Sequence, residues 1–435
     1  MLYPVLALSG VAFYLLAYHT ERENFFQVIS LFTILFAGYY VSYKFFSVTH
    51  FKYLVIAAIL FRILLLFSVP NLSDDVYRFI WDGRLAANGI NPFSYLPVEI
   101  MQMPSVTGIT KELFGQLNST QHYTIYPPVL QGIFWLAAKV FPVNVRGAII
   151  LLKCIILMFE IGTLFLLGQI LKKLSLSKHL ALLYFINPLV ITELTGNVHF
   201  EGVMIFFVLF AFLLLLKKNW TRSAICLALG IATKLIPVIF LPLVINKLGW
   251  KKGMQYSLIS LITSLILFAL VFDIATIQHM LNSIDLFIRK FEFNASIYYV
   301  VRYFGNQIKG YNIIAIAGPF LILLSALIIF IISFWNKNIG WQFFFTKALF
   351  IITTWFLFST TVHPWYICTV AAISIFTRHR YAIVWCYTAT FSYYAYQSIP
   401  VKENLWLVAF SYLLMMGYAF WELLIERKKL NTIPH

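Results

Sequence analysis

Apolar segments about as long as a bilayer core recur along the whole chain, and they restrict the folds open to it. The first three cover residues 2–18, 25–46 and 51–69, and a transmembrane helix needs roughly 20 apolar residues. Only 11% of the 435 residues are charged and 61% are hydrophobic, which excludes a soluble fold of this length. The sequence therefore predicts an all-α, polytopic membrane protein. We expect a single integral membrane domain over residues 1–435, with about 12–14 transmembrane helices.

Basic residues outnumber acidic ones, giving a formal net charge of +16, and most of them lie in short loops between apolar segments. Short loops rich in Lys and Arg are typical of the cytoplasmic side, so this charge predicts membrane orientation and no nucleic-acid partner. Lys44 and Lys52 place the second connection in the cytoplasm, and the segment after residue 69 then emerges outside. The later basic clusters are Lys172-Lys173 with Lys178, Lys217-Lys218 with Arg222, Lys247 with Lys251-Lys252, Lys337, and Arg378 with Arg380.

The four cysteines lie singly inside apolar segments, a pattern that favours neither a disulfide framework nor a zinc site. The sequence also has no phosphate-binding glycine loop, dinucleotide fingerprint or serine-hydrolase elbow. These observations argue against cytosolic nucleotide or serine-hydrolase chemistry. The cysteines are Cys154, Cys226, Cys368 and Cys386.

The most unusual polar stretch covers residues 71–84. In an α-helix Asp75, Arg78 and Asp82 lie on one face, because their spacing is close to whole helical turns. Asn88-Gly89 is a helix-stop signal. The sequence therefore predicts a short amphipathic helix at a membrane surface, with acidic side chains beside the bilayer. The charged residues of this stretch are Asp74, Asp75, Arg78, Asp82 and Arg84.

Helix capping is the alternative interpretation of these acids. Ser73 would cap the helix, and Asp74 and Asp75 would be favoured by the positive end of its dipole. Capping accounts for one or two acids but not for Asp82 and the two arginines. The sequence favours a functional site.

Residues 70–128 form the longest hydrophilic segment and predict an external loop that contains amphipathic helices. The loop ends in Tyr126-Pro127-Pro128. Because the next basic loop, at residues 172–173, is cytoplasmic, an odd number of membrane crossings must separate the two loops. We assign one span to residues 146–170 and an interfacial or re-entrant piece to residues 129–141.

Polar residues that interrupt the apolar pattern fall on the outer side of this topology. Its outer turns are residues 196–202, 232–237, about 273–310, 362–365 and 398–404. Scattered structural polar residues would not be expected on a single side, so the pattern predicts one pocket at the outer leaflet. Arg62 and Glu160, by contrast, lie mid-span and are interpreted as a structural pair or gate. The outer polar residues are Asp74, Asp75, His199, Glu201, Lys234 and His363.

Each of these positions also has an ordinary structural interpretation. His199 and Glu201 form a turn flanked by glycines that could simply be an interfacial polar turn. Lys234 could snorkel to the interface, or it could bind a lipid-linked phosphate as a point charge. His363, next to Pro364 and Trp365, could belong to an aromatic belt.

The stretch of residues 71–84, together with Gly89-Ile-Asn-Pro92, resembles the first external loop of bacterial GT-C glycosyltransferases. The resemblance is strongest to the polyprenyl-phosphate-mannose-dependent mannosyltransferase type (GT87-like). One position departs from the pattern, because these enzymes usually carry Asp where this chain has Glu201. The other matching pieces are Tyr126-Pro127-Pro128, Asn187-Pro188, Asn197-Val-His199, Lys234-Leu-Ile-Pro237, Phe293-Asn-Ala-Ser296 and His363-Pro-Trp-Tyr366.

The resemblance implies a GT-C fold and a membrane glycosyltransferase. Such an enzyme moves a hexose, with mannose the expected sugar, from a polyprenyl-phosphate donor to a lipid- or glycan-linked hydroxyl, with inversion. The reaction would take place at the outer leaflet of the inner (plasma) membrane, facing the periplasm. We expect no cofactor and no metal, because a lipid-phosphate leaving group carries less charge than a nucleotide diphosphate. The expected partners are the donor, the acceptor and membrane lipids, and the expected oligomeric state is a monomer.

Inverting transfer needs a carboxylate base for the acceptor proton and cations for the departing phosphate. Asp74 or Asp75 supplies the base. We prefer Asp74, with Asp75 as its support, because Asp74 lies nearer the start of the helix. Lys234, His363 and Arg78 are the candidate cationic groups. The other residues assigned to substrate binding are Asp82, Arg84, Tyr126, His199, Glu201, Asn294 and Trp365.

A transporter or flippase of lipid-linked sugars is the alternative function. It would also carry intramembrane charges and an outer cavity, but its two halves should show matching broken helices. The sequence shows one such break, near residues 234–237, and a long external loop that has no counterpart in the other half. A non-catalytic scaffold would not gather its ionisable residues on one face.

Overall fold

The structure, a computed structural model, describes residues 1–272, 274–337 and 339–431. Within these ranges the regular elements are helices, and an isolated bridge pairs Phe293 with Thr361. The predicted all-α class is confirmed. The chain divides into two compact units, which are described separately. Unit 1 consists of Met1–Ile59, Leu174–Ile191 and Glu292–His435, and unit 2 consists of Leu60–Lys173 and Thr192–Phe291.

Unit 1 combines helices from both ends of the chain. They are α1 (Leu2–Tyr18), α2 (Phe25–Phe46), most of α3 (Phe51–Leu65), η1 (Lys178–Ala181), α9 (Leu182–Phe185), α10 (Pro188–Val190), α16 (Ile297–Lys309), α17 (Ile314–Phe334), α18 (Trp341–Phe358), η4 (Pro364–Tyr366), α19 (Ile367–Ser374), α20 (Tyr381–Thr388), η5 (Ala389–Gln397) and α21 (Leu405–Asn431). Helix α1 packs against α2, α17 against α18, and α20 against α21.

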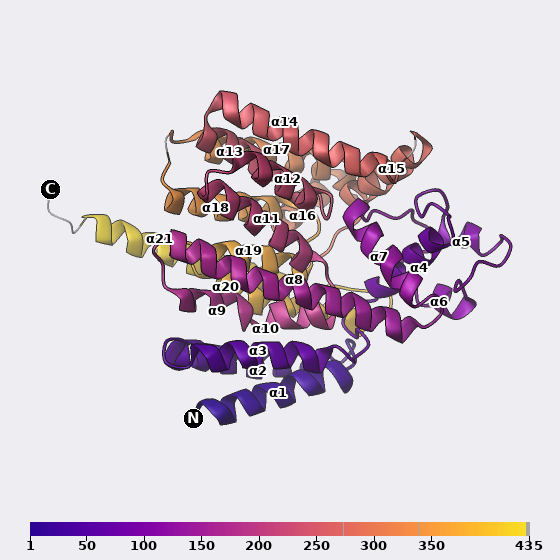
Figure 1. The fold of residues 1–435 in the computed structure, drawn as a ribbon, viewed down its shortest axis with the longest axis horizontal. Coiled ribbons are helices and arrows are strands. Elements are labelled where there is room, and N and C mark those ends of the chain that lie inside the picture. Colours follow the sequence, from indigo (N-terminus) through magenta and orange to yellow (C-terminus); the bar gives the residue numbers. More distant parts are fainter. Residues whose placement is uncertain (273, 338, 432–435) are drawn as a thin grey trace. The chain divides into compact units, whose positions relative to one another are not determined.

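Unit 2 contains the predicted external loop and the central helices. They are α4 (Asp75–Ala87), α5 (Pro97–Ile100), α6 (Lys111–Gly115), α7 (Pro128–Val140), α8 (Val145–Lys173), the π-helical η2 (Ile191–Gly196), α11 (Glu201–Leu216), α12 (Trp220–Ile231), η3 (Ile236–Phe240), α13 (Leu241–Leu248), α14 (Trp250–Ala269) and α15 (Ile274–Arg289). Helix α8 packs along α11, and α4 packs against α7 (Figure 1). The single span expected over residues 146–170 is α8, and the separate piece expected over residues 129–141 is α7.

Six helices in the described part of the chain are long and apolar enough to cross a membrane: α2, α8, α14, α17, α18 and α21. A bent pair, Lys178–Phe185 with Pro188–Gly196, raises the number to seven. The protein is therefore a multi-pass membrane protein, and this length criterion selects fewer helices than the expected spans, about 12–14. The reason is that several apolar segments form helices of only 10–17 residues.

Two of the apolar segments are broken at prolines. Helix α12 ends at Ile231, and the chain passes through η3, which contains Pro237, before α13 begins. The second break is a bend of 53° between α9 and the segment that starts at Pro188. The side chain of Asn187 caps this segment by accepting a hydrogen bond from the Leu189 N–H. Only the first of these breaks, near residues 234–237, was predicted from the sequence.

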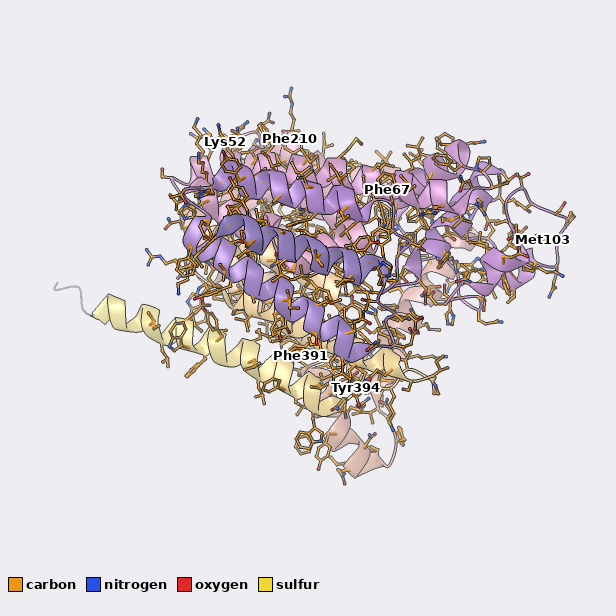
Figure 2. All side chains as sticks on the ribbon, turned by 90° about the horizontal axis from the view of Figure 1, so that it is seen from below. Lys52, Phe67, Met103, Phe210, Phe391 and Tyr394 are labelled. Carbon is orange, nitrogen blue, oxygen red and sulfur yellow. The ribbon has the colours of Figure 1, made fainter. Side chains whose placement is uncertain are left out.

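Helix α21 presents much of its apolar surface to the outside. Trp406 is 86% exposed and Leu413 is 69% exposed, so they are far from the burial expected of such residues in a soluble core. Figure 2 shows side chains projecting away from the pale yellow ribbon of α21 over most of its length. This surface suits contact with lipid chains.

Arg62 and Glu160 form an ion pair inside unit 2. Their nitrogen and oxygen atoms are 3.1 Å apart, and both side chains are fully buried. The interpretation of these two residues as a structural pair is confirmed. Gly202 lies against the pair, because a Cβ atom there would be 3.1 Å from Glu160 Oε1. The pair therefore lies directly beneath the start of α11.

Candidate active site

Helix α4 carries the charged residues of the predicted external helix. It begins at Asp75, whose N–H donates to Ser73 Oγ at 3.3 Å, and it ends at Asn88, followed by Gly89 in the left-handed conformation at φ 77°. The end of the helix agrees with the predicted Asn88-Gly89 stop. Its N-cap, however, is Asp74 and not Ser73, and the Asp74 side chain makes no capping hydrogen bond.

Close packing fixes α4 against α7. A Cβ atom at Gly83 would be 2.2 Å from the carbonyl oxygen of Phe134, so only glycine allows this approach. An aromatic cluster holds the same interface: Phe79 stacks on Phe134 at 4.8 Å between ring centroids, and Tyr126 meets Phe79 edge-on at 4.9 Å. Phe200 contacts Phe79 and Phe134 at 5.4 Å. Through Phe200, the cluster connects α4 to the turn before α11.

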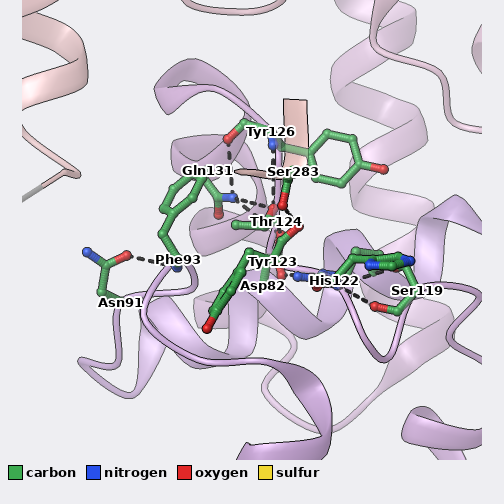
Figure 3. Close-up of polar contacts among 11 residues, drawn as sticks. Asp82, Asn91, Phe93, Ser119, His122, Tyr123, Thr124, Tyr126, Gln131 and Ser283 are labelled. Carbon is green, nitrogen blue, oxygen red and sulfur yellow. Dashed lines mark hydrogen bonds and ion pairs between the residues drawn. The ribbon is translucent and has the colours of Figure 1, made fainter. Parts of the chain in front are cut away.

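Asp82 lies fully buried at the centre of a polar network (Figure 3). It accepts hydrogen bonds from Arg78 Nε at 2.8 Å, Thr124 Oγ1 at 2.5 Å and Gln131 Nε2 at 3.3 Å. Gln131 also donates to the carbonyl oxygen of Tyr126. The carboxylate thereby ties α4 to the chain that leads into α7.

The two arginines of α4 hold the rest of the external loop. Arg78 Nη1 donates to the carbonyl oxygens of Ser119 and His122 at 3.0 and 2.9 Å. Arg84 Nη1 donates to the carbonyl oxygen of Gly108 at 2.6 Å, and burial lowers the pKa of Arg84. Arg78, Asp82 and Arg84 therefore all bind protein groups.

Asp75 differs from Asp82 in its surroundings. Its side chain is 26% exposed, and Oδ1 accepts a hydrogen bond from Asn118 Nδ2 at 3.2 Å. Oδ2 lies 4.0 Å from His199 Nε2. Asp74 occupies the N-cap position and is half-buried. Asp75 is thus the acid of α4 that meets the histidine of the second motif.

The turn that carries His199 is tied to the start of α4. Asn197 Oδ1 accepts a hydrogen bond from the Leu72 N–H at 3.4 Å. Val198 adopts φ 62°, a left-handed conformation that is strained for a β-branched residue. Such strain persists only where the surroundings fix it, and it is typical of functional sites.

Lys234 forms an ion pair with Glu201, the first residue of α11. The Glu201 side chain is fully buried, whereas that of Lys234 is 20% exposed. The Val129 N–H donates to the carbonyl oxygen of Ala232 at 3.0 Å, which joins the start of α7 to the turn containing Lys234. Unit 2 thereby brings together the four motifs at residues 71–84, 126–128, 197–201 and 232–237.

Asn294 belongs to unit 1 and is buried among backbone groups. Its N–H donates to Glu403 Oε1 at 2.6 Å, and its side-chain amide donates to the carbonyl oxygen of Val362 at 3.0 Å. Tyr412 donates to its carbonyl oxygen at 2.7 Å. Asn294 also adopts φ 46°, a conformation that asparagine tolerates better than most residues. It joins the segments of three predicted outer turns.

His363 lies between two aromatic rings in unit 1. It stacks on Trp365 with the ring planes 4° apart and the centroids 4.4 Å apart, and on Phe293 at 4.9 Å. Nearby, Tyr299 donates a hydrogen bond to Glu403, and burial raises the pKa of Glu403. The structure thus brings Asn294, His363 and Trp365 together within unit 1.

Three residues of unit 2 were missed in the sequence reading. Asn118 donates to Asp75, and Glu193 contacts the His199 ring. Lys153 Nζ donates to the carbonyl oxygens of Leu65 and Ser68 at the end of α3. Glu193 and Lys153 are charged residues within apolar segments, and such residues are rare enough to be a functional signal by themselves.

Among the described residues no group of three or more His, Cys, Asp or Glu side chains is arranged to hold a metal ion.

Comparison with known proteins identifies the family. Residues 5–248 match the family described as alpha-(1->6)-mannopyranosyltransferase, N-terminal domain. The chain belongs to this family. The match contains all of the candidate site residues of unit 2, and Asn294, His363 and Trp365 lie beyond it.

A curated relative supports the same family. The alpha-(1->6)-mannopyranosyltransferase A of Corynebacterium glutamicum is 24% identical over 182 residues. The aligned stretch covers 42% of this chain and 36% of that protein. The resemblance to bacterial mannosyltransferases that the sequence motifs suggested is therefore confirmed at the level of the family.

Proposed function

We propose that the protein is a membrane glycosyltransferase that moves mannose from a polyprenyl-phosphate donor to a hydroxyl of a lipid- or glycan-linked acceptor. The single observation that carries this proposal is the meeting of Asp75 with His199, in a unit that also holds the Lys234–Glu201 pair. Family membership supports mannose as the sugar. The corynebacterial relative is named as an alpha-(1->6)-mannopyranosyltransferase, which favours an α-1,6 linkage in the product.

Asp75 is the proposed general base, which reverses the preference drawn from sequence. Its carboxylate is partly exposed and is held by Asn118. In the reaction, Asp75 takes the proton of the acceptor hydroxyl while the acceptor oxygen forms a bond to the sugar C1. The bond between C1 and the phosphate oxygen breaks, and its electron pair stays on the polyprenyl phosphate. Attack from the face opposite the phosphate inverts C1.

The leaving phosphate gains negative charge, and cations placed near it lower the barrier. Lys234 is the proposed partner in unit 2, oriented by Glu201. An ammonium has three N–H donors, so contact with Glu201 is compatible with contact to a phosphate oxygen. Within unit 1, His363 is held between aromatic rings beside Trp365, and these two residues are proposed to bind substrate through the imidazole N–H and the indole ring. The side-chain amide of Asn294 supports this cluster by donating a hydrogen bond to the carbonyl oxygen of Val362.

Arg78, Asp82, Arg84 and Tyr126 are proposed to act through the shape of the loop. They hold residues 108–131 on α4, and this arrangement places Asn118 beside Asp75. Substitution of any of these four residues should therefore affect Asp75, the proposed base, only through the shape of the loop.

We propose that the site faces outward at the inner (plasma) membrane, as the distribution of basic loops predicts. Ser105 and Lys173 are both exposed and lie on opposite sides in this topology. In a background without the four native cysteines, a membrane-impermeant maleimide applied to intact cells or spheroplasts should label Ser105→Cys and not Lys173→Cys. The reverse labelling pattern would overturn the orientation.

The transferase proposal is tested with purified protein. Polyprenyl-phosphate mannose with a labelled sugar is supplied together with an octyl α-mannoside acceptor or extracted membrane lipids. Labelled mannose should appear in the acceptor, and the product from the α-mannoside should be cleaved by an α-1,6-specific mannosidase. Donor that is only carried across a proteoliposome membrane, with no transfer to any acceptor, would favour the transporter alternative.

A further inference from the structure

Glu193 is a fully buried carboxylate that contacts the imidazole of His199. It lies in the π-helical turn η2, a type of turn that is rare and often found at functional sites. Its Oε2 atom is 3.3 Å from His199 Nδ1, and its main-chain carbonyl oxygen is 3.0 Å from the same nitrogen. One residue thus presents two oxygen atoms to one ring nitrogen.

These contacts define the proton on Nδ1. A carboxylate oxygen and a carbonyl oxygen are both hydrogen-bond acceptors, so Nδ1 carries a hydrogen and donates it. In a neutral imidazole the other nitrogen, Nε2, would then carry a lone pair. That lone pair would face Asp75 Oδ2 at 4.0 Å, so two hydrogen-bond acceptors would oppose each other.

A second proton on Nε2 removes this conflict. His199 is 2% exposed, so water screens it little. Two carboxylates, one at each ring nitrogen, favour the charged imidazolium over the neutral ring. The distance of 4.0 Å from Nε2 to Asp75 is beyond a hydrogen bond but within the range of an ion pair.

The backbone around the ring fixes this arrangement. Asn197 Nδ2 donates to Glu193 Oε1 at 3.3 Å, and Asn197 Oδ1 accepts from the Leu72 N–H. The left-handed conformation of Val198 turns the chain between Asn197 and His199. These contacts therefore fix the positions of Glu193 and the His199 imidazole relative to the start of α4.

We infer that Glu193 is a positioning residue that holds His199 as an imidazolium directed at Asp75. The inference rests on the proposed function, since Asp75 matters only if it is the base. The imidazolium orients the Asp75 carboxylate for the acceptor hydroxyl. Glu193 acts through His199 and does not touch the substrate.

A pH dependence follows from this arrangement. The charged groups that contact the ring are Asp75 from α4 and Glu193 from η2, and the Glu201–Lys234 pair begins two residues further along the chain. Neutralising Glu193 removes one of the two carboxylates that favour the imidazolium over the neutral ring. A lower pH supplies protons and favours the imidazolium again.

The test measures kcat and the donor KM of the full-length protein between about pH 5.5 and 8, with the donor and acceptor of the transfer assay. Glu193→Gln should lower kcat about tenfold near pH 7.5, because the imidazolium loses one of its two anionic neighbours. The deficit should shrink as the pH falls, and the donor KM should stay within about twofold. Thr195→Val, a buried change on the same turn, is the matched control and should keep the wild-type pH profile.

The outcomes separate this inference from the proposed function. If Asp75→Asn abolishes transfer while Glu193→Gln shows a deficit that is constant with pH, or none, the positioning role is overturned and the transferase stands. If the wild-type protein transfers no mannose, the proposed function falls and the inference falls with it. Should Glu193→Gln not fold, Glu193→Asp is measured instead, because its shorter side chain withdraws the carboxylate from the ring. A smaller deficit with the same pH trend supports the inference, and a pH-independent deficit overturns it.

Discussion

Asp75→Asn should lower the rate of sugar transfer about 10²- to 10⁴-fold, the usual effect of losing a general base. Asparagine keeps the shape of the side chain and can still bind Asn118, but it cannot accept the acceptor proton. The donor and the acceptor should still bind, because the proposed phosphate contact is not changed. The measurement is single-turnover transfer at saturating donor, together with donor binding to the variant protein.

Asp74→Asn is the matched control, since it removes a neighbouring carboxylate at the N-cap of the same helix. We expect it to lose no more than about tenfold in rate through the helix dipole and local charge. If Asp74→Asn abolishes transfer while Asp75→Asn does not, the base is Asp74, as the sequence first suggested. If both variants turn over normally, the transferase proposal is contradicted.

The helix that carries these acids could be predicted from sequence because its limits are local. Asp75 in its first turn and the Asn88-Gly89 stop lie within one short stretch, and the structure places both as expected, although Asp74 rather than Ser73 is the N-cap. The single long span α8 and the separate α7 followed from counting crossings between charged loops. Both are arguments about neighbouring residues and membrane thickness.

The number of spans could not be predicted in the same way. Hydropathy measures how apolar a segment is and does not register where the segment breaks. The bend before Pro188 and the interruption between α12 and α13 shorten helices whose composition alone suggests full spans. A proline lies at each of the two breaks, and a capping asparagine precedes Pro188. Only tertiary packing shows which prolines interrupt a helix.

The partners of the charged residues were the least predictable part of the site. Spacing on α4 suggested Asp75 beside Arg78, whereas Arg78 binds Asp82 at the i,i+4 spacing that also favours ion pairs. The actual neighbour of Asp75 is His199, which is far away in sequence. Glu193 belongs to none of the sequence motifs, and its contact with His199 depends on the π-helical turn η2 and on the left-handed conformation of Val198.

The substitution of Glu for the Asp usual in related enzymes has an explanation in this structure. Glu201 is buried, and it pairs with Lys234 rather than facing the base. The longer side chain of glutamate suits this reach across the turn. We therefore propose that Glu201 orients the lysine and has no direct role in the chemistry.

Lys234→Met should raise the donor KM about 10- to 150-fold, because a hydrogen bond to a charged group is worth about 1.5–3 kcal/mol. The acceptor KM should change little, since the proposed contact is with the donor phosphate. Removing the lysine alone leaves the buried Glu201 carboxylate without its ion-pair partner, so the double variant Lys234→Met with Glu201→Gln guards against unfolding. Lys139→Met is the control, because this exposed lysine of the same unit donates to the carbonyl oxygen of Ala87.

Two measurements distinguish a Lys234 that binds phosphate from one that only stabilises the turn: the donor KM and the thermal stability. A lysine that only stabilises the turn would lower the thermal stability of the protein, and the Glu201→Gln change would restore part of it without affecting the donor KM. A lysine that binds phosphate should keep the donor KM high in the folded double variant, and Lys234→Arg should recover part of the affinity. His363→Gln, measured in the same way, reports whether the unit 1 cluster contributes to donor binding. An unchanged donor KM in the double variant would make Lys234 a structural partner of Glu201 alone.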